Sequence, residues 1–186
     1  MPSAVDICNR ALSRVGEARI TSLTDDTKQA RACNSAYSLV RDEVLRAHPW
    51  NSAIARASVA KLSDDPALGY GAQYQLPSDC LRVVEVYDTK LPWVVEGRKL
   101  LSDEGSPLSI RYVRREEDTN QFDALLVSAI AARLAMELCE ELTQSNTKRE
   151  RAGMEYEAIL SRAKSADAQE QSPMPFEEDD WINARY

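Results

Sequence analysis

The feature that most constrains this chain is a change of pattern in its middle. Before Trp50 and after Asn120, apolar residues recur at helical spacing, whereas residues 50–115 hold short apolar runs separated by proline and glycine. A chain of 186 residues is long enough to bury a sizeable core within one domain. The pattern therefore predicts an α+β fold, mostly α: a helical bundle of about four helices with a small β-rich insertion between helices two and three.

Four segments are expected to be helical, namely residues 4–15, 26–47, 121–142 and 147–165. Ser3 and Asp6 form a capping-box-like start for the first helix, with Asp in place of Glu, and Gly16 ends it. The third helix is apolar on more than one face, which is typical of a helix that lies between neighbours.

The second helix has its own start and stop signals. Asp25 and Asp26 favour a helix N-terminus, and Pro49 disfavours a helical conformation at His48. His48 is the only histidine, and no serine or cysteine nucleophile motif is identifiable near it. We therefore expect it to cap or pack the helix end rather than to act in catalysis.

The middle of the chain predicts strands at about 53–61, 81–87, 93–96, 99–101 and 108–113. Glu96-Gly97 is the expected hairpin turn. Along residues 108–113, apolar and polar side chains mostly alternate, which favours a sheet with one packed face and one mostly wet face. Gly69-Tyr70-Gly71 lacks the lysine and hydroxyl residue of a phosphate loop and is expected to be a flexible loop.

Cysteine and acidic residues give no sign of a metal or cofactor. The four cysteines are scattered without a Cys-x-x-Cys pair, and we expect reduced core thiols at Cys8, Cys33, Cys80 and Cys139. The acidic run at residues 177–180 could bind a divalent cation, but it lacks the turn glycine and spaced ligands of a calcium loop. A solvated or partner-facing segment suits it better.

Charge is concentrated at the C-terminal end. Residues 166–186 hold six acidic side chains against Arg185 and so carry −5 of the net −7. The rest is near neutral and shows no basic stripe, which disfavours tight DNA binding. There is no apolar run of about 20 residues, and the start of the chain lacks a charged segment followed by an apolar one, so we expect neither a membrane span nor export.

Residues 166–186 lose helical periodicity and read as an extended acidic C-terminal arm. The segment holds too little apolar surface to order alone, yet it contains Phe176, Trp181, Ile182 and Tyr186. Aromatic anchors in an acidic segment are typical of a peptide that orders when it buries those anchors in a partner.

Three phrases, in a fixed order, resemble one known family. They are His48-Pro49-Trp50, Leu76-Pro77-Ser78-Asp79-Cys80-Leu81-Arg82-Val83, and Trp93-Val94-Val95-Glu96-Gly97-Arg98-Lys99-Leu100-Leu101. Together with residues 4–16, Ile20-Thr21-Ser22-Leu23 and residues 181–185, they resemble the tail tubular protein A, or head-to-tail adaptor (connector), family of tailed bacteriophages. The resemblance covers most of the chain.

The resemblance implies a structural virion protein rather than an enzyme. Residues 1–165 would form the adaptor domain of a ring, a homo-oligomer of twelve subunits, that docks under the portal protein, extends the DNA channel and offers a platform to a downstream tail or nozzle protein. DNA would pass through the lumen without specific binding. The location would be the head-to-tail interface of the virion, after assembly in the host cytoplasm, with no cofactor, metal or membrane involved.

Two groups of residues are candidate contact sites in such a ring. The arm would bind the portal through Phe176, Trp181, Ile182, Arg185 and Tyr186. Five basic residues could line the channel or contact a neighbouring subunit, and an exposed strand face is an equal alternative for them: Arg98, Lys99, Arg111, Arg114 and Arg115.

Two tryptophans, Trp50 and Trp93, are expected to be core anchors where the β-rich insertion meets the helices.

The alternative function is a small helical regulatory or scaffold module that recruits a partner through its acidic aromatic tail.

Overall fold

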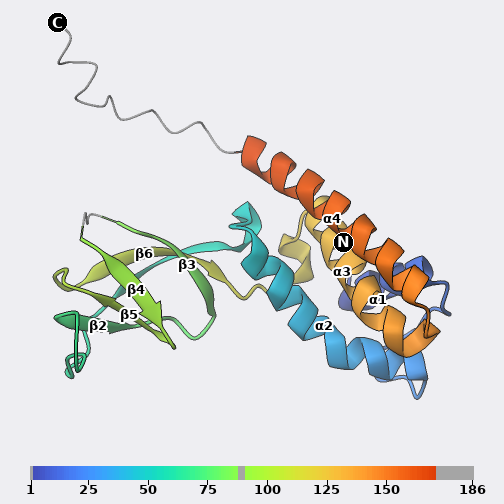
Figure 1. Ribbon diagram of the computed structural model, residues 1–186, viewed down its shortest axis with the longest axis horizontal. Coiled ribbons are helices and arrows are strands. Elements are labelled where there is room, and N and C mark those ends of the chain that lie inside the picture. The colour runs from blue at the N-terminus through green and yellow to red at the C-terminus, as the bar shows by residue number, and fades with distance from the viewer. Residues whose placement is uncertain (1, 88–90, 171–186) are drawn as a thin grey trace, which may run out of the picture.

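A computed structural model describes residues 2–87 and 91–170 of the chain, which form an elongated molecule with a helical lobe and a β lobe (Figure 1). The helices are α1 (Ala4–Val15), α2 (Lys28–Ala47), α3 (Ala124–Thr143) and α4 (Asn146–Gln169). The strands are β1 (Ile54–Val59), β2 (Ala72–Gln75), β3 (Cys80–Val86), β4 (Trp93–Glu96), β5 (Lys99–Ser102) and β6 (Leu108–Arg114). The expected fold class, α+β and mostly α, is confirmed.

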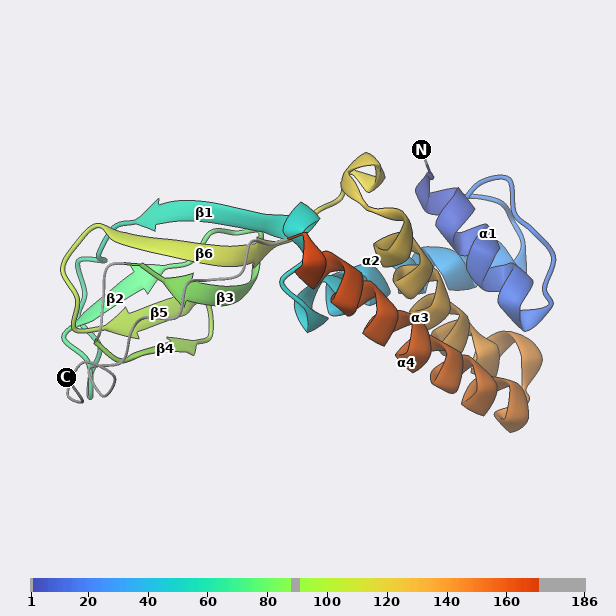
Figure 2. The same ribbon diagram turned by 90° about the horizontal axis from the view of Figure 1, so that it is seen from above.

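Helix α3 lies at the centre of the helical lobe and packs against α1, α2 and α4. Figure 2 shows α4 running along α3 toward the β lobe. Because neighbours cover several sides of α3, side chains all around it are buried, including Leu126, Ile130, Leu134 and Leu138. This explains the apolar pattern that the sequence shows on more than one face of this helix.

Helix α1 begins and ends as predicted. The Asp6 backbone N–H donates to Ser3 Oγ (3.1 Å), and the Ser3 N–H donates to Asp6 Oδ2 (2.8 Å). This reciprocal pair is a capping box with Asp in the third position. Gly16 follows the helix at φ 81°, in the left-handed conformation that glycine adopts without strain.

Helix α2 begins two residues later than predicted. Thr27 caps it by accepting a hydrogen bond from the Ala30 N–H (3.1 Å). Asp25 instead accepts from the backbone N–H groups of Thr21 (2.8 Å) and Ser22 (3.0 Å), so it closes the preceding loop. A carboxylate near a helix start can thus serve the loop rather than the helix.

The boundaries of the last two helices also differ from the prediction. Residues Thr119–Gln121 form a 3-10 turn, and Asp123 caps α3, so this helix begins at Ala124 rather than at residue 121. Helix α4 does not end at residue 165 but continues to Gln169. The last turn of α4 therefore includes the first residues that the sequence assigned to the arm.

The β lobe consists of two three-stranded antiparallel sheets, in the orders β1-β6-β3 and β2-β5-β4. Apolar side chains of both sheets form its core, which includes Tyr74, Leu100 and Ile110. All five predicted strands are present, with bounds that differ from the prediction by at most two residues, whereas β2 was missed. Its sequence, Ala-Gln-Tyr-Gln, is short and polar, and it is ordered by pairing with β5.

The turn of the β4–β5 hairpin consists of Gly97 and Arg98, one residue later than the predicted Glu96-Gly97. Glu96 pairs with Lys99, which leaves two residues in the turn, and Gly97 adopts φ 59° at the first of them. A two-residue turn with positive φ at its first position favours glycine there. This turn fixes the position of the next residue, Arg98.

Strand β6 contributes to both cores. Leu108, Ile110 and Tyr112 face the β core, as their alternation predicts, but Val113 is fully buried in the helical core. The predicted wet face of this strand is therefore dry at its end, because the helical lobe covers it there.

Candidate functional site

The helical lobe and the β lobe meet at His48-Pro49-Trp50. His48 leaves the helix in an extended conformation (φ −149°), as expected for a residue before proline. The Trp50 ring is 0% exposed, and its Nε1–H donates to the Val44 carbonyl (2.9 Å). The His48 ring meets it edge-on, with centroids 4.8 Å apart and planes at 70°. Trp50 is thus the core anchor that the sequence predicts.

Asp167 closes the same junction from α4. Its buried carboxylate lies 3.0 Å from His48 Nε2 and accepts a hydrogen bond from the Asn51 N–H at 2.9 Å. The Asn51 side chain in turn donates to the Asp167 carbonyl (2.9 Å). The last turn of α4 is therefore fixed to the end of α2, and His48 has a packing role.

A set of hydrogen bonds around Arg98 joins the two longer phrases of the adaptor resemblance. The Arg98 guanidinium donates to the carbonyl of Cys80 (2.9 Å) and to that of Pro77. The Leu76 N–H donates back to the Arg98 carbonyl (3.1 Å). Arg98 thereby holds the Pro77-Ser78-Asp79-Cys80 turn against the β4–β5 hairpin, so phrases that lie apart in the sequence form one unit in the fold.

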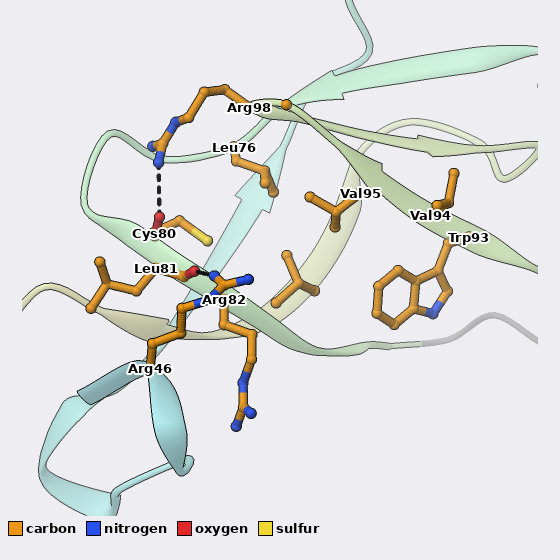
Figure 3. Close-up of a pocket in the computed structure, with 11 residues that line it drawn as sticks. Arg46, Leu76, Cys80, Leu81, Arg82, Trp93, Val94, Val95 and Arg98 are labelled. Atoms are coloured by element: carbon orange, nitrogen blue, oxygen red, sulfur yellow. Dashed lines mark hydrogen bonds between the residues drawn. The ribbon is translucent and has the colours of Figure 1, made fainter. Parts of the chain in front are cut away.

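This unit borders a pocket of about 530 Å³ between β3, the β4–β5 hairpin and the end of α2 (Figure 3). The volume lies within the range of about 300–1,000 Å³ that is typical of ligand pockets. Its walls include the apolar side chains of Leu76, Leu81, Trp93 and Val95. Trp93 is half-buried here, so it lines a pocket at the edge of the β core rather than anchoring the junction of the lobes.

Three arginines also line the pocket, and no carboxylate of residues 2–87 or 91–170 does. Arg98 bonds the two carbonyls described above, and Arg46 donates to the Leu81 carbonyl (Figure 3). Arg82, whose side chain lies beside Arg46, makes no hydrogen bond or ion pair through its guanidinium with the described residues, and its Nε is buried. Burial and the neighbouring Arg46 charge lower the pKa of Arg82.

The five basic residues singled out in the sequence all have partners within the chain. Arg98 is described above, and Lys99 Nζ donates to Gln73 Oε1 (3.0 Å). The other three form ion pairs, which join Arg111 to Glu85 (3.6 Å), Arg114 to Glu116, and Arg115 to Asp42 (2.7 Å). They come from both sheets and from the segment after β6. A role in a channel or at a subunit contact stays a prediction for these residues.

The predicted arm contacts cannot be placed. Phe176, Trp181, Ile182, Arg185 and Tyr186 lie outside the described residues. The last described part of the chain, the end of α4, lies beside the start of β1 at the junction of the lobes (Figure 2).

The four cysteines lie in buried surroundings. Cys8, Cys33, Cys80 and Cys139 are all buried and unpaired, as predicted. A hydrogen bond with Cys33 and burial raise the pKa of the Cys8 thiol, and burial raises the pKa of Cys80. These two thiols therefore stay protonated at neutral pH and are poor nucleophiles.

Within residues 2–87 and 91–170, no three His, Cys, Asp or Glu side chains are grouped so that they could hold a metal ion. None of the helices in this part of the chain is long and apolar enough to span a membrane.

Sequence reasoning missed two of the pocket arginines, Arg46 and Arg82. Arg46 sits in the last turn of α2, where a basic residue has an ordinary role beside the helix C-terminus. Arg82 follows a bulge in β3, so its side chain departs from simple strand alternation. The signal that could have pointed to them is the set of adaptor-like phrases, because Arg46 precedes His48 by two residues and Arg82 lies within the phrase at residues 76–83.

No protein-family model matches this sequence, and no curated protein matches it. The resemblance to head-to-tail adaptors therefore stays a prediction from the sequence.

Proposed function

We propose that this chain is the subunit of a bacteriophage head-to-tail adaptor, a connector ring of twelve copies that docks under the portal and carries the tail. One observation supports this best: the two longer phrases that resemble the adaptor family are joined by Arg98 at the pocket, and the helix that ends at the first phrase contributes Arg46 to the same pocket. Phrases that matched the family only by chance would not be expected to form one structural unit.

A buried junction suits a ring subunit. A closed ring requires each copy to present two fixed surfaces to its neighbours. Burial of Trp50 beside Val113 of β6 and the contact of Asp167 with Asn51, just before β1, restrict hinge motion where the chain enters the β lobe. In the ring, the β lobe would face the tail or the neighbouring subunit.

Two exposed apolar side chains are candidates for contacts between subunits. Leu39 on α2 is 72% exposed, and Met154 on α4 is 70% exposed. Each would gain free energy by moving out of water into a neighbour's surface. Both lie on helices, so helices would pack between subunits as well as within them.

The charge distribution suits a channel through which DNA slides. The chain carries a net charge of −7, and the five basic residues named above have partners within the chain. Strong retention of DNA requires many unpaired Lys and Arg groups facing its phosphates. DNA would therefore pass through the lumen without being held.

The proposed activity is binding without turnover, in the virion, with the portal above and a tail or nozzle protein below. The acidic arm would supply the portal contact through Phe176, Trp181, Ile182, Arg185 and Tyr186. Each arm would bind weakly, but a ring presents many arms at once, and multivalency turns weak contacts into a durable joint.

Light scattering on a sizing column would test the proposal, with the protein alone and mixed with the portal ring of its virus. The comparison uses the full chain and a chain that ends at Glu170, because an end at residue 165 would remove Asp167 from the junction. We expect the full chain to add about 250 kDa to the portal, which corresponds to twelve copies of 20.8 kDa.

The outcomes separate the proposals. If the shortened chain fails to bind, the portal contact lies beyond residue 170. Equal binding by both chains would leave the adaptor proposal intact and exclude the arm as the main contact. Absence of binding by both would contradict the adaptor function and favour the regulatory or scaffold module.

A further inference from the structure

Arg82 carries a charge that the described structure does not balance. Three arginines have a buried Nε without a hydrogen-bond partner, namely Arg82, Arg111 and Arg114. Arg111 and Arg114 each form an ion pair, with Glu85 and Glu116. Arg82 has no such partner among residues 2–87 and 91–170, and its nearest charged neighbour in the pocket is another cation, Arg46. A half-buried cation next to a like charge is unfavourable unless an anion joins it.

The surroundings of Arg82 indicate the chemistry of that anion. Arg46, Arg82 and Arg98 supply positive charge on one part of the pocket wall, and Trp93, Val95 and Leu76 supply apolar surface on the rest. Arginine binds carboxylates through paired N–H groups, and apolar walls favour an adjoining aromatic side chain. A peptide with carboxylates beside an aromatic residue matches both parts.

We propose that this pocket is a binding site for an acidic peptide, and that its occupant is the chain's own segment Glu177-Glu178-Asp179-Asp180-Trp181. The segment has four consecutive carboxylates followed by a tryptophan. The carboxylates would pair with Arg82 and Arg46, and Trp181 would pack near Trp93. The pocket and the segment belong to the same chain, so the contact forms in a single subunit without assembly of a ring.

The segment is long enough to reach the pocket. Helix α4 ends beside His48, because Asp167 pairs with that residue at 3.0 Å, and pocket residue Arg46 lies two residues earlier in α2. The end of α4 and Arg46 are therefore separated by about 10–12 Å, the width of a helix. The seven residues from Glu170 to Glu177 can span up to about 23 Å.

An occupant from the same chain is favoured over a nucleic acid. Three arginines in an acidic protein are few for phosphate-backbone binding, which depends on many released counterions. A segment tethered within reach is present at an effective concentration in the millimolar range, so even a weak contact is occupied. A partner that binds the arm would compete with this contact.

Hydrogen exchange of the full chain, read by mass spectrometry, tests the contact. We expect amides of residues 177–183 to exchange at least about tenfold more slowly than in a free peptide of residues 171–186. In Arg82→Gln this protection should be lost. The matched control is Arg149→Gln, which removes a half-exposed arginine of α4 that pairs with Glu140 at the surface (2.9 Å), and it should keep the protection.

A second variant keeps the test independent of the fold. Replacing the four acids of the segment by their amides (Glu177→Gln, Glu178→Gln, Asp179→Asn and Asp180→Asn) leaves every described residue unchanged and should also abolish the protection. Exchange at the free-peptide rate in the unmodified chain would overturn the proposal. So would protection that persists in both Arg82→Gln and the four-amide variant.

A protein concentration series and a competition with DNA identify what occupies the pocket. Protection that does not change between about 0.5 and 50 μM protein supports a contact within one chain, since an intramolecular contact is independent of concentration. Protection that appears only at high concentration would place the segment in another copy and contradict the proposal. Loss of protection on addition of a short DNA duplex, but not of the same increase in salt, would assign the pocket to phosphate instead.

Discussion

The helical lobe and the β lobe touch at two neighbouring places that are built in opposite ways. At the junction, Trp50 is fully buried and Asp167 has a hydrogen-bond partner for each carboxylate oxygen. At the pocket, the described lining holds three arginines and no carboxylate, and Arg82 has no partner in this part of the chain. The difference indicates that the junction stabilises the fold. The pocket keeps an unbalanced charge, which lowers stability but leaves the pocket able to bind an anion.

The largest expected effect comes from breaking the junction at its apolar centre. Trp50→Ala would remove a fully buried ring and leave a cavity in the helical core beside the junction, at a cost of about 3–5 kcal/mol in the free energy of unfolding. Chemical denaturation would measure it. Trp93→Ala is the matched control, and because Trp93 is half-buried at the pocket we expect a clearly smaller loss. An equal loss in both variants would contradict the distinction.

The next effect comes from the polar part of the junction. Asp167→Ala would leave His48 and the Asn51 N–H without their partner, at a cost of about 1–3 kcal/mol. Thermal unfolding of this variant should be compared with that of Glu170→Ala, which changes a residue just past the helix end. A fully stable Asp167→Ala protein would show that the end of α4 is not fixed to α2.

Arg98 should have a smaller effect, because its side chain is on an exposed hairpin. Arg98→Ala would remove the hydrogen bonds to the Pro77 and Cys80 carbonyls, at a cost of about 1 kcal/mol. Arg98→Lys should restore little of this, since a single ammonium group does not reproduce the fork of a guanidinium. Denaturation of both variants beside Lys99→Ala would measure the difference. Full rescue by lysine would contradict the bridging role.

Arg82 should have the smallest effect on stability. In the chain that ends at Glu170, Arg82→Gln removes a charge that makes no hydrogen bond or ion pair with the described residues, so the free energy of unfolding should change by no more than about 0.5 kcal/mol. Relief of repulsion with Arg46 could raise it slightly. A loss above about 1 kcal/mol in a denaturation series would show that Arg82 is structural, and the contrast between the two contacts would fail.

Much of the fold could be predicted from the sequence because its local signals agree. Ser3 and Asp6 cap α1 in the structure as the sequence predicts, and Gly97 lies in the hairpin turn. The apolar residues around α3 correctly indicate its central place. Strand β2 could not be predicted, since pairing with β5 rather than its own polar sequence orders it.

The site was harder to predict because it depends on contacts between distant segments. Asp167 lies in a polar stretch that gives no sign of burial, yet the end of α2 fixes it. Arg46 and Arg82 look like ordinary charges of a helix end and a strand, and only the fold places them together with Arg98. Such juxtapositions leave no periodicity in the sequence.

Electron microscopy of portal rings mixed with the full chain tests the adaptor function most directly. The proposal predicts an added ring of density on the portal axis, on the side where the tail attaches, with one copy of the two-lobed subunit in each of twelve positions. Portal rings that remain bare at saturating concentrations of a folded chain would contradict it.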